Sequence, residues 1–263
     1  MTSSLLLSVT TFLYLLVALG YLLALVFKRP GLSRAANLLV WLTTALQTVA
    51  IALRWIESYQ MGIGHAPLTN MYESLVFFAW AILLAYLVVQ RRYRSPALGL
   101  AVAPFAFLAM AYASFGTESQ IQPLIPALQS NWLIAHVVTC FLGYAALAVS
   151  CGAAIFLLAK GGQADSADEL VYRSLLIGFL LLSAGIGTGA VWADKAWGAY
   201  WSWDPKETWS LITWLVYAVI IHGRVKRGWQ GRGLAWGSVL GFICVLFTYL
   251  GVNFLLPGLH SYG

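Results

Sequence analysis

Long apolar stretches separated by short polar segments run along the whole chain. They lack the short periods of amphipathic helices and the alternation of half-buried strands, which is the pattern of membrane-spanning segments. A helix needs about 20 apolar residues to cross a bilayer, because lipid offers no partners for backbone N–H and C=O groups. The pattern therefore predicts an all-α polytopic protein, a single integral membrane domain over residues 1–263, with spans near 4–27, 37–56, 71–90, 97–115, 132–159, 174–191, 208–223 and 235–256.

The composition supports a membrane protein. Hydrophobic residues make up 61% of the chain and charged residues only 9%, with a mean hydropathy of +0.81. A water-soluble domain of this size needs far more charge to cover its surface. The composition therefore excludes a soluble protein, and we expect the lipid bilayer to be the main surroundings of the chain.

The basic residues predict the orientation. Twelve of the 15 Lys and Arg residues follow the first, third, fifth and seventh spans. Basic segments stay in the cytoplasm, so we expect both termini on the external or periplasmic side. This bias, together with anionic lipid, accounts for the net charge of +6 and indicates no nucleic-acid partner. The twelve residues are Lys28, Arg29, Arg34, Arg91, Arg92, Arg94, Lys160, Arg173, Arg224, Lys226, Arg227 and Arg232.

A glycine-rich segment, Gly185-Ile-Gly187-Thr-Gly189, invites comparison with a nucleotide-binding loop. It follows no strand and lies within a predicted span, so that interpretation fails in its context. Small residues spaced along a membrane helix allow a neighbouring helix to approach closely. We therefore predict that these glycines serve helix packing.

Tryptophan is concentrated in one predicted external segment, residues 192–209. Half of the twelve Trp residues of the chain lie between 192 and 214. An aromatic belt at the membrane surface would be spread over many helix ends, so the concentration favours a ligand site. We expect four rings to form a flat apolar surface for a large planar ligand, and Asp204 to follow as part of a charged, rigid entry to the next span. The four ring residues are Trp197, Tyr200, Trp201 and Trp203.

The histidines differ in predicted depth. His136 lies near the outer end of the fifth span and His260 just beyond the eighth, so both are level with the Trp-rich segment. Two imidazoles at that height are suited to bind one iron from opposite sides, although a single interfacial His is often only hydrogen-bonded. His222, near the inner end of the seventh span, is either a second functional site or a residue that reaches the membrane surface. For His65, in an external loop before Pro67, we expect a structural or solvent-facing role rather than ligation.

Several segments resemble a known family. The segment from Trp197 to Trp209, WGAYWSWDPKETW, is similar to the WWD signature of heme-handling proteins, and most similar to the CcsA/ResC type of System II cytochrome c biogenesis. Other similar segments are Leu68-Thr-Asn-Met-Tyr-Glu-Ser74, Asn131-Trp-Leu-Ile-Ala-His136, Leu142-Gly-Tyr-Ala-Ala146, Gly251-Val-Asn-Phe254 and Gly258-Leu-His-Ser-Tyr-Gly263. The similarity covers residues 68–263.

The resemblance implies a function and a set of site residues. It implies that the WWD loop, residues 192–209, binds heme b (iron-protoporphyrin IX) on the external face, with His136 and His260 as axial ligands. His222 would bind a second heme within the membrane. Heme would pass from the inner to the outer site and meet an apocytochrome c, whose C-x-x-C-H thiols add to the heme vinyl groups. The location would be a bacterial inner (cytoplasmic) membrane or a thylakoid membrane.

The resemblance also implies a partner. Family members act with a CcsB/ResB-type membrane protein, which is sometimes fused to them. We find no such region in this chain, so we expect it to be one subunit of a cytochrome c synthase complex. Such a complex is one source of a second ligand for the heme of His222, and the sequence leaves that source open.

Two other functions remain open at this point. A CcmC-like subunit, which delivers heme to a chaperone, shares the WWD loop but has six spans. The other is a membrane transporter or scaffold that does not bind heme. A transporter would need paired charges within the membrane, and the chain offers few, whereas in a scaffold the Trp-rich loop would only dock a protein partner. Arg54 and Glu57, one helical turn apart, are expected to form a local ion pair.

Overall fold

The structure is a computed structural model that describes residues 2–258, and this range contains helices and no strands. Eight of these helices are long and apolar enough to cross a membrane, which confirms the predicted all-α, eight-span architecture. They are α1 (Thr2–Phe27), α2 (Pro30–Gln60), α3 (Met71–Gln90), α4 (Pro96–Gly116), α5 (Asn131–Ala159), α6 (Asp165–Trp197), α7 (Pro205–Arg227) and a last span, Arg232–Leu255. The last span consists of α8 (Arg232–Leu246), a π-helical turn (Phe247–Gly251) and α9 (Val252–Leu255), and a 3₁₀ turn, η1 (Pro126–Leu128), precedes α5.

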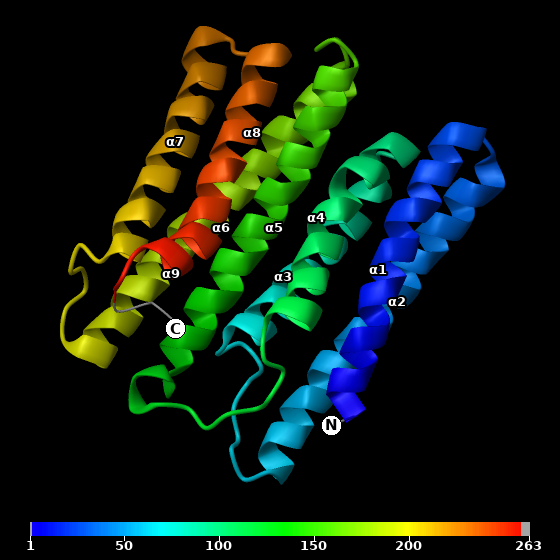
Figure 1. The fold of residues 1–263 in the computed structure, drawn as a ribbon. Helices are drawn as coiled ribbons and strands as arrows, with labels where there is room; N and C mark the ends of the chain where they lie inside the picture. Colours follow the sequence, from blue (N-terminus) through cyan, green and yellow to red (C-terminus); the bar gives the residue numbers. More distant parts are fainter. Residues whose placement is uncertain (1, 259–263) are drawn as a thin grey trace. The chain divides into compact units, whose positions relative to one another are not determined.

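The helices form two compact units, of which the first ends at Ile125 and the second begins at Pro126. In the first unit α1 packs against α2 and α4, and α3 packs against α4 (Figure 1). In the second unit α5 packs against α6 and α8, and α7 packs against α8. Short connections make consecutive helices antiparallel, so the start of α5, the end of α6 and the start of α7 lie at one end of the second unit. We call this the outer end, after the predicted orientation.

The helix α6 extends well beyond the predicted span of 174–191. Its 33 residues give a length of about 50 Å, against about 30 Å for the hydrocarbon core of a bilayer. Hydropathy marks only the part of a helix that suits lipid, and the polar ends continue the same helix. As a result, residues 192–197 of the Trp-rich segment are helical, and only residues 198–204 connect α6 to α7.

Glycines on one face of α6 allow α5 to approach it closely. A Cβ atom added at Gly185 would lie 2.5 Å from the Cys140 Sγ, and one added at Gly189 would lie 2.6 Å from the His136 Nδ1. One added at Gly187, on another face, would meet nothing within 4 Å. The prediction that these glycines serve helix packing is therefore confirmed for Gly185 and Gly189 but not for Gly187.

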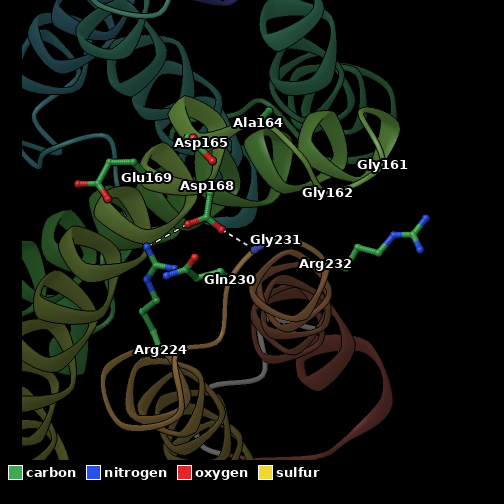
Figure 2. Close-up of a pocket in the computed structure, with 10 residues that line it drawn as sticks. All are labelled: Gly161, Gly162, Ala164, Asp165, Asp168, Glu169, Arg224, Gln230, Gly231 and Arg232. Atoms are coloured by element: carbon green, nitrogen blue, oxygen red, sulfur yellow. Dashed lines mark hydrogen bonds and ion pairs between the residues drawn. The ribbon is translucent and has the colours of Figure 1, made fainter.

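At the other end of the second unit, the Asp168 carboxylate joins three segments (Figure 2). Its Oδ1 accepts a hydrogen bond from the Gly231 N–H at 2.7 Å, and its Oδ2 lies 3.0 Å from the Arg224 Nη2. Asp168 is buried, so the pair links α6 to the end of α7 and to the turn before α8. A cavity of about 690 Å³ beside it is lined by side chains of both charges, which does not favour a ligand of either sign.

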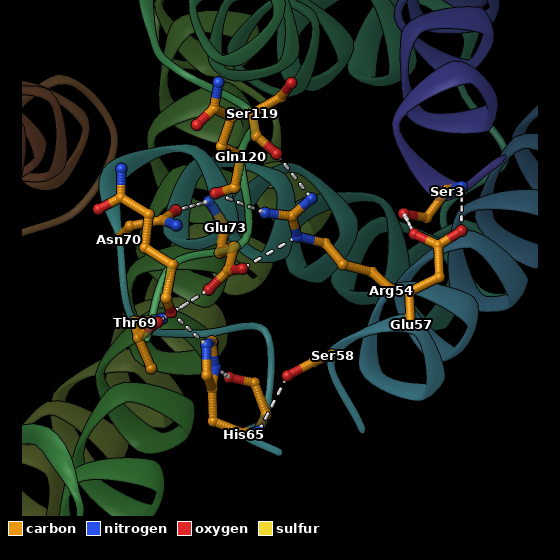
Figure 3. Close-up of polar contacts among 12 residues, drawn as sticks. Ser3, Arg54, Glu57, Ser58, His65, Thr69, Asn70, Glu73, Ser119 and Gln120 are labelled. Atoms are coloured by element: carbon orange, nitrogen blue, oxygen red, sulfur yellow. Dashed lines mark hydrogen bonds and ion pairs between the residues drawn. The ribbon is translucent and has the colours of Figure 1, made fainter. Parts of the chain in front are cut away.

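In the first unit, Arg54 forms a buried ion pair with Glu73, 2.9 Å from Nε to Oε1 (Figure 3). The Arg54 guanidinium also donates to the Ser119 carbonyl oxygen at 2.9 Å. The predicted pair of Arg54 with Glu57 is wrong, because the Glu57 carboxylate accepts hydrogen bonds from the backbone N–H and hydroxyl of Ser3 instead. The spacing along α2 suggested a partner on the same helix, whereas the observed partner of Arg54 is Glu73 on α3.

His65 has the structural role that its sequence context predicted. It is buried, and its Nδ1 and Nε2 lie 2.9 Å and 3.0 Å from the carbonyl oxygens of Ala66 and Gln122. Its backbone N–H donates to the Ser58 hydroxyl at 3.0 Å. His65 therefore fastens the connection between α2 and α3 to the segment that follows α4.

Candidate functional site

The connection between α6 and α7 is short and is fixed at both ends. Gly198 ends α6 in the left-handed conformation, with φ of 78°, and its N–H donates to the Asp194 carbonyl oxygen at 2.9 Å. Asp204 caps α7, accepting the Lys206 N–H at 3.0 Å, and Pro205 occupies the first helical position. Glycine beyond a helix end and Asp-Pro before a helix start are the residues that these positions favour.

The Glu207 carboxylate holds the middle of this connection. Its Oε2 accepts the backbone N–H groups of Ser202 at 2.7 Å and of Asp204 at 3.2 Å. The Ser202 hydroxyl donates to the same carboxylate. With Asp204 this forms a capping box, in which the cap and the third helical residue bond reciprocally. Glu207 therefore fixes the two residues on either side of Trp203.

Trp203 is held in an unfavourable backbone conformation and points into solvent or lipid. Its φ is 59°, a left-handed value that costs a residue with a Cβ about 1–2 kcal/mol. Its side chain is 68% exposed, and that of Tyr200 is 60% exposed. Strain of this kind persists only where the surroundings impose it, and it is typical of functional sites. The loop thus presents an indole that packing within the second unit does not require.

The aromatic rings of the Trp-rich segment meet edge to face. Trp201 and Trp203 are 5.8 Å apart at an interplanar angle of 88°, and Trp192 and Trp197 are 4.9 Å apart at 74°. The four predicted residues therefore do not stack into one flat surface. Trp197 belongs to the end of α6, whereas Tyr200, Trp201 and Trp203 belong to the loop.

His136 lies in the second turn of α5 and is oriented by α6. Its Nδ1 is 2.7 Å from the Gly185 carbonyl oxygen, which can only accept, so the proton is on Nδ1 and Nε2 carries the ligating lone pair. Metal-binding histidines generally have this arrangement, in which the second nitrogen donates to a carbonyl or carboxylate. The structure thus gives His136 the tautomer that an iron ligand needs.

Trp192 completes the surroundings of His136, a role that the sequence analysis did not distinguish from that of the loop tryptophans. Its ring stacks on the imidazole, with centroids 6.0 Å apart and an interplanar angle of 14°. It is buried, and its Nε1 donates to the Ala127 carbonyl oxygen in η1 at 2.9 Å. Trp192 and the glycine face of α6 together fix the plane of the imidazole. A prediction that the sixth helix continues to residue 197 would have placed Trp192 one turn beyond Gly189, beside His136.

The other predicted ligands lie apart from this cluster or outside the described residues. His222 is exposed on α7, near the end that carries Arg224. His260 lies outside the described residues. Gly258, two residues earlier, packs against the loop: a Cβ added there would lie 2.5 Å from the Asp204 Oδ1 and 3.1 Å from the Pro205 Cδ.

A family profile described as cytochrome C assembly protein matches residues 68–260. The chain belongs to this cytochrome c assembly family. The matched range begins at the Leu68 segment and includes the whole of the second unit as far as His260. Family membership therefore covers every residue of the candidate site.

Curated family relatives named "Cytochrome c biogenesis protein CcsA" are similar over most of their length. That of Parasynechococcus marenigrum is 43% identical over 266 residues, covering 86% of this chain and 86% of that protein. That of Prochlorococcus marinus is 40% identical over 294 residues, covering 98% of this chain and 93% of that protein. These relatives confirm the resemblance to the CcsA type and favour it over the CcmC-like alternative.

Among solved structures, this chain is similar to the cytochrome c heme lyase CcmF, with a TM-score of 0.75 and 21% sequence identity. The match covers 95% of this chain but 47% of that one, so the chain spans about half the length of CcmF. At this identity the likeness concerns the fold. It shows that the same helical arrangement occurs in that protein.

Proposed function

We propose that this protein moves heme b across its membrane and presents it at the outer loop to an apocytochrome c, as one subunit of a cytochrome c synthase complex. Heme is the substrate, and the membrane is a bacterial inner membrane or a thylakoid membrane. The C-x-x-C-H thiols of the client add across the heme vinyl groups, with S–H hydrogen and sulfur both retained in the thioether product. The proposal builds on family membership and on the geometry of the second unit.

The orientation of His136 carries the proposal. A histidine that serves only packing has no need for a fixed tautomer, a stacked indole and two close glycines. These contacts direct the ligating Nε2 and limit rotation of the ring. In such a site catalysis is mainly positioning, because heme itself supplies the reactivity.

The loop supplies aromatic surface beside this ligand. Trp203 and Tyr200 are exposed, and Glu207 maintains the strained conformation that exposes Trp203. A porphyrin buries large apolar area against such rings. Gly258 brings the chain that leads to His260 against Asp204, which supports His260 as the second axial ligand.

His222 marks a second heme site that the partner completes. It lies on one exposed face of α7 with Leu215 and Val219, which are 49% and 60% exposed. An ionisable residue on a face directed to lipid is costly unless another group pairs with it. We therefore propose that a CcsB/ResB-type subunit covers this face and provides the second ligand to a heme within the membrane.

Visible absorption of the purified complex tests the proposed function. We expect a red preparation with the spectrum of six-coordinate, low-spin heme bound by two histidines. A preparation that stays colourless after heme is supplied would contradict the proposal and would support a transporter or scaffold.

Trp203→Gly separates heme binding from folding. Glycine adopts a φ of 59° without strain, and the indole is mostly exposed, so we expect unfolding stability within about 1 kcal/mol of the natural protein. Heme affinity should fall about tenfold, the value of one aromatic stacking contact. Thermal unfolding and heme titration measure the two effects. Trp203→Phe is the control that retains affinity, and equal heme affinity in Trp203→Gly would argue against a role for the indole.

His222→Ala tests the inner site. We expect the inner heme to be lost from the isolated complex, whereas heme added in detergent still loads the outer site. Val219→Ala, one turn away on the same face of α7, should keep both hemes. Heme content per complex, measured by the pyridine hemochrome method, distinguishes these results. Normal loading of both sites in His222→Ala would reject the assignment.

A further inference from the structure

Lys206 and Asn253 form a polar pair beneath the loop that the function described so far does not use. Lys206 lies in the first turn of α7 and Asn253 in α9, and both are half-buried. The Lys206 Nζ donates to the Asn253 Oδ1 at 2.5 Å. The pair therefore joins the start of the seventh span to the end of the eighth.

This contact fixes which way the Asn253 amide faces. An ammonium group has donors and no acceptor, so the amide must turn its oxygen to Lys206 and its NH₂ group away. That Nδ2 is buried, and it has no hydrogen-bond partner among the residues that the structure describes. A buried donor without an acceptor is rare in folded proteins, so we expect an acceptor other than the described residues to bind this Nδ2.

The surroundings favour an anionic acceptor. A cation in the first turn of a helix faces the positive end of the helix dipole, which disfavours Lys206 unless negative charge is near. The Asp204 carboxylate contributes such charge and accepts the Lys206 backbone N–H. A further acceptor would satisfy the Asn253 Nδ2, and a carboxylate can accept this hydrogen bond and is also attracted to an ammonium group.

Lys206 and the proposed iron ligand lie at the same end of the second unit, since Lys206 is in the first turn of α7 and His136 is in the second turn of α5. A porphyrin whose iron is bound by His136 extends several ångströms sideways, and its two carboxylates lie on one edge.

We propose that Lys206 and Asn253 bind a carboxylate of the substrate, one of the heme propionates, through the ammonium group and the amide NH₂. This inference rests on the proposed function. It adds the rotational orientation of the porphyrin about the axis through its iron. With the propionate edge directed to Lys206, the vinyl groups lie on the opposite side of the ring. The pair thus decides which edge is left for the thiols of the client.

Esterified heme tests this pair separately from the iron ligand. The probe is heme against heme dimethyl ester, titrated into the full-length protein with its partner subunit. We expect the natural protein to bind heme about tenfold or more tightly than the ester, the loss that corresponds to charge-assisted hydrogen bonds. Lys206→Met should bind both compounds with the weaker affinity, and Lys206→Arg should retain the preference.

Asn253→Asp is the sharper variant, because it keeps an oxygen acceptor for Lys206 and replaces the amide donor by a negatively charged oxygen, which repels a carboxylate. We expect it to fold as the natural protein does, to lose affinity for heme about tenfold or more, and to bind the ester unchanged. Equal affinities of the natural protein for heme and ester, or parallel losses for both in Asn253→Asp, would overturn the inference while the proposed function stands. Failure of the natural protein to bind either compound would overturn both.

Discussion

His136→Ala is expected to remove the outer heme signal. The variant lacks the imidazole whose Nε2 we propose as the iron ligand, and the glycines that face it on α6 have no side chain to replace it. Loss of a residue that only orients a metal ligand costs about 10–100-fold in affinity, so loss of the ligand itself should cost about a hundredfold or more. Heme titration followed by Soret absorbance measures the change. Added imidazole should restore a six-coordinate spectrum, because the space left by the side chain remains lined by Trp192 and the glycines.

A matched control is available one turn earlier on α5. Trp132 is 39% exposed and lies near Lys195, and Trp132→Ala should leave heme binding close to that of the natural protein. If His136→Ala loses heme but imidazole does not restore it, the side chain acts through folding. An unchanged spectrum in His136→Ala together with His260→Ala would reject both ligands.

Glu207→Ala is expected to lower both stability and heme affinity. Removing the carboxylate leaves the backbone N–H groups of Ser202 and Asp204 without their acceptor, a cost of about 3 kcal/mol. Trp203 then has nothing to maintain its left-handed conformation, so the loop relaxes. We expect heme affinity to fall about tenfold or more, since the aromatic contacts are no longer positioned. Thermal unfolding and heme titration provide the two readings.

The control for Glu207→Ala is Glu118→Ala, which removes an exposed carboxylate from the predicted outer side of the first unit. Its unfolding temperature and heme affinity should both match those of the natural protein. Glu207→Gln keeps one acceptor oxygen and should fall between the natural protein and Glu207→Ala. Full heme affinity in a destabilised Glu207→Ala would show that the loop conformation does not determine binding.

The eight spans could be predicted because hydropathy reflects the lipid surroundings directly. Helix ends could not be predicted from the same signal, since α6 continues for six residues past the predicted end of its span. Polar and aromatic residues at the membrane surface are compatible with either a loop or a helix, and packing against η1 and α5 decides between them. The Arg54 pairing failed for a related reason, because its partner is on a neighbouring helix.

Within the candidate site, the sequence indicated which residues matter but not how they are arranged. The depth of His136 followed from its place in the fifth span, whereas its tautomer depends on a carbonyl group of α6. The role of Glu207 was accessible from the spacing of Asp204 and Glu207, which is that of a capping box. The unpaired amide NH₂ of Asn253 could not be predicted from the sequence, because only the folded second unit brings Asn253 to Lys206.

A cryo-electron microscopy map of the complex with bound heme would show whether His136 binds the iron. We expect iron density next to the Nε2 of His136, with the porphyrin against the loop that carries Trp203 and the Nδ1 still bound to the Gly185 carbonyl oxygen. Heme density elsewhere in the protein, with the His136 imidazole directed to lipid, would contradict it.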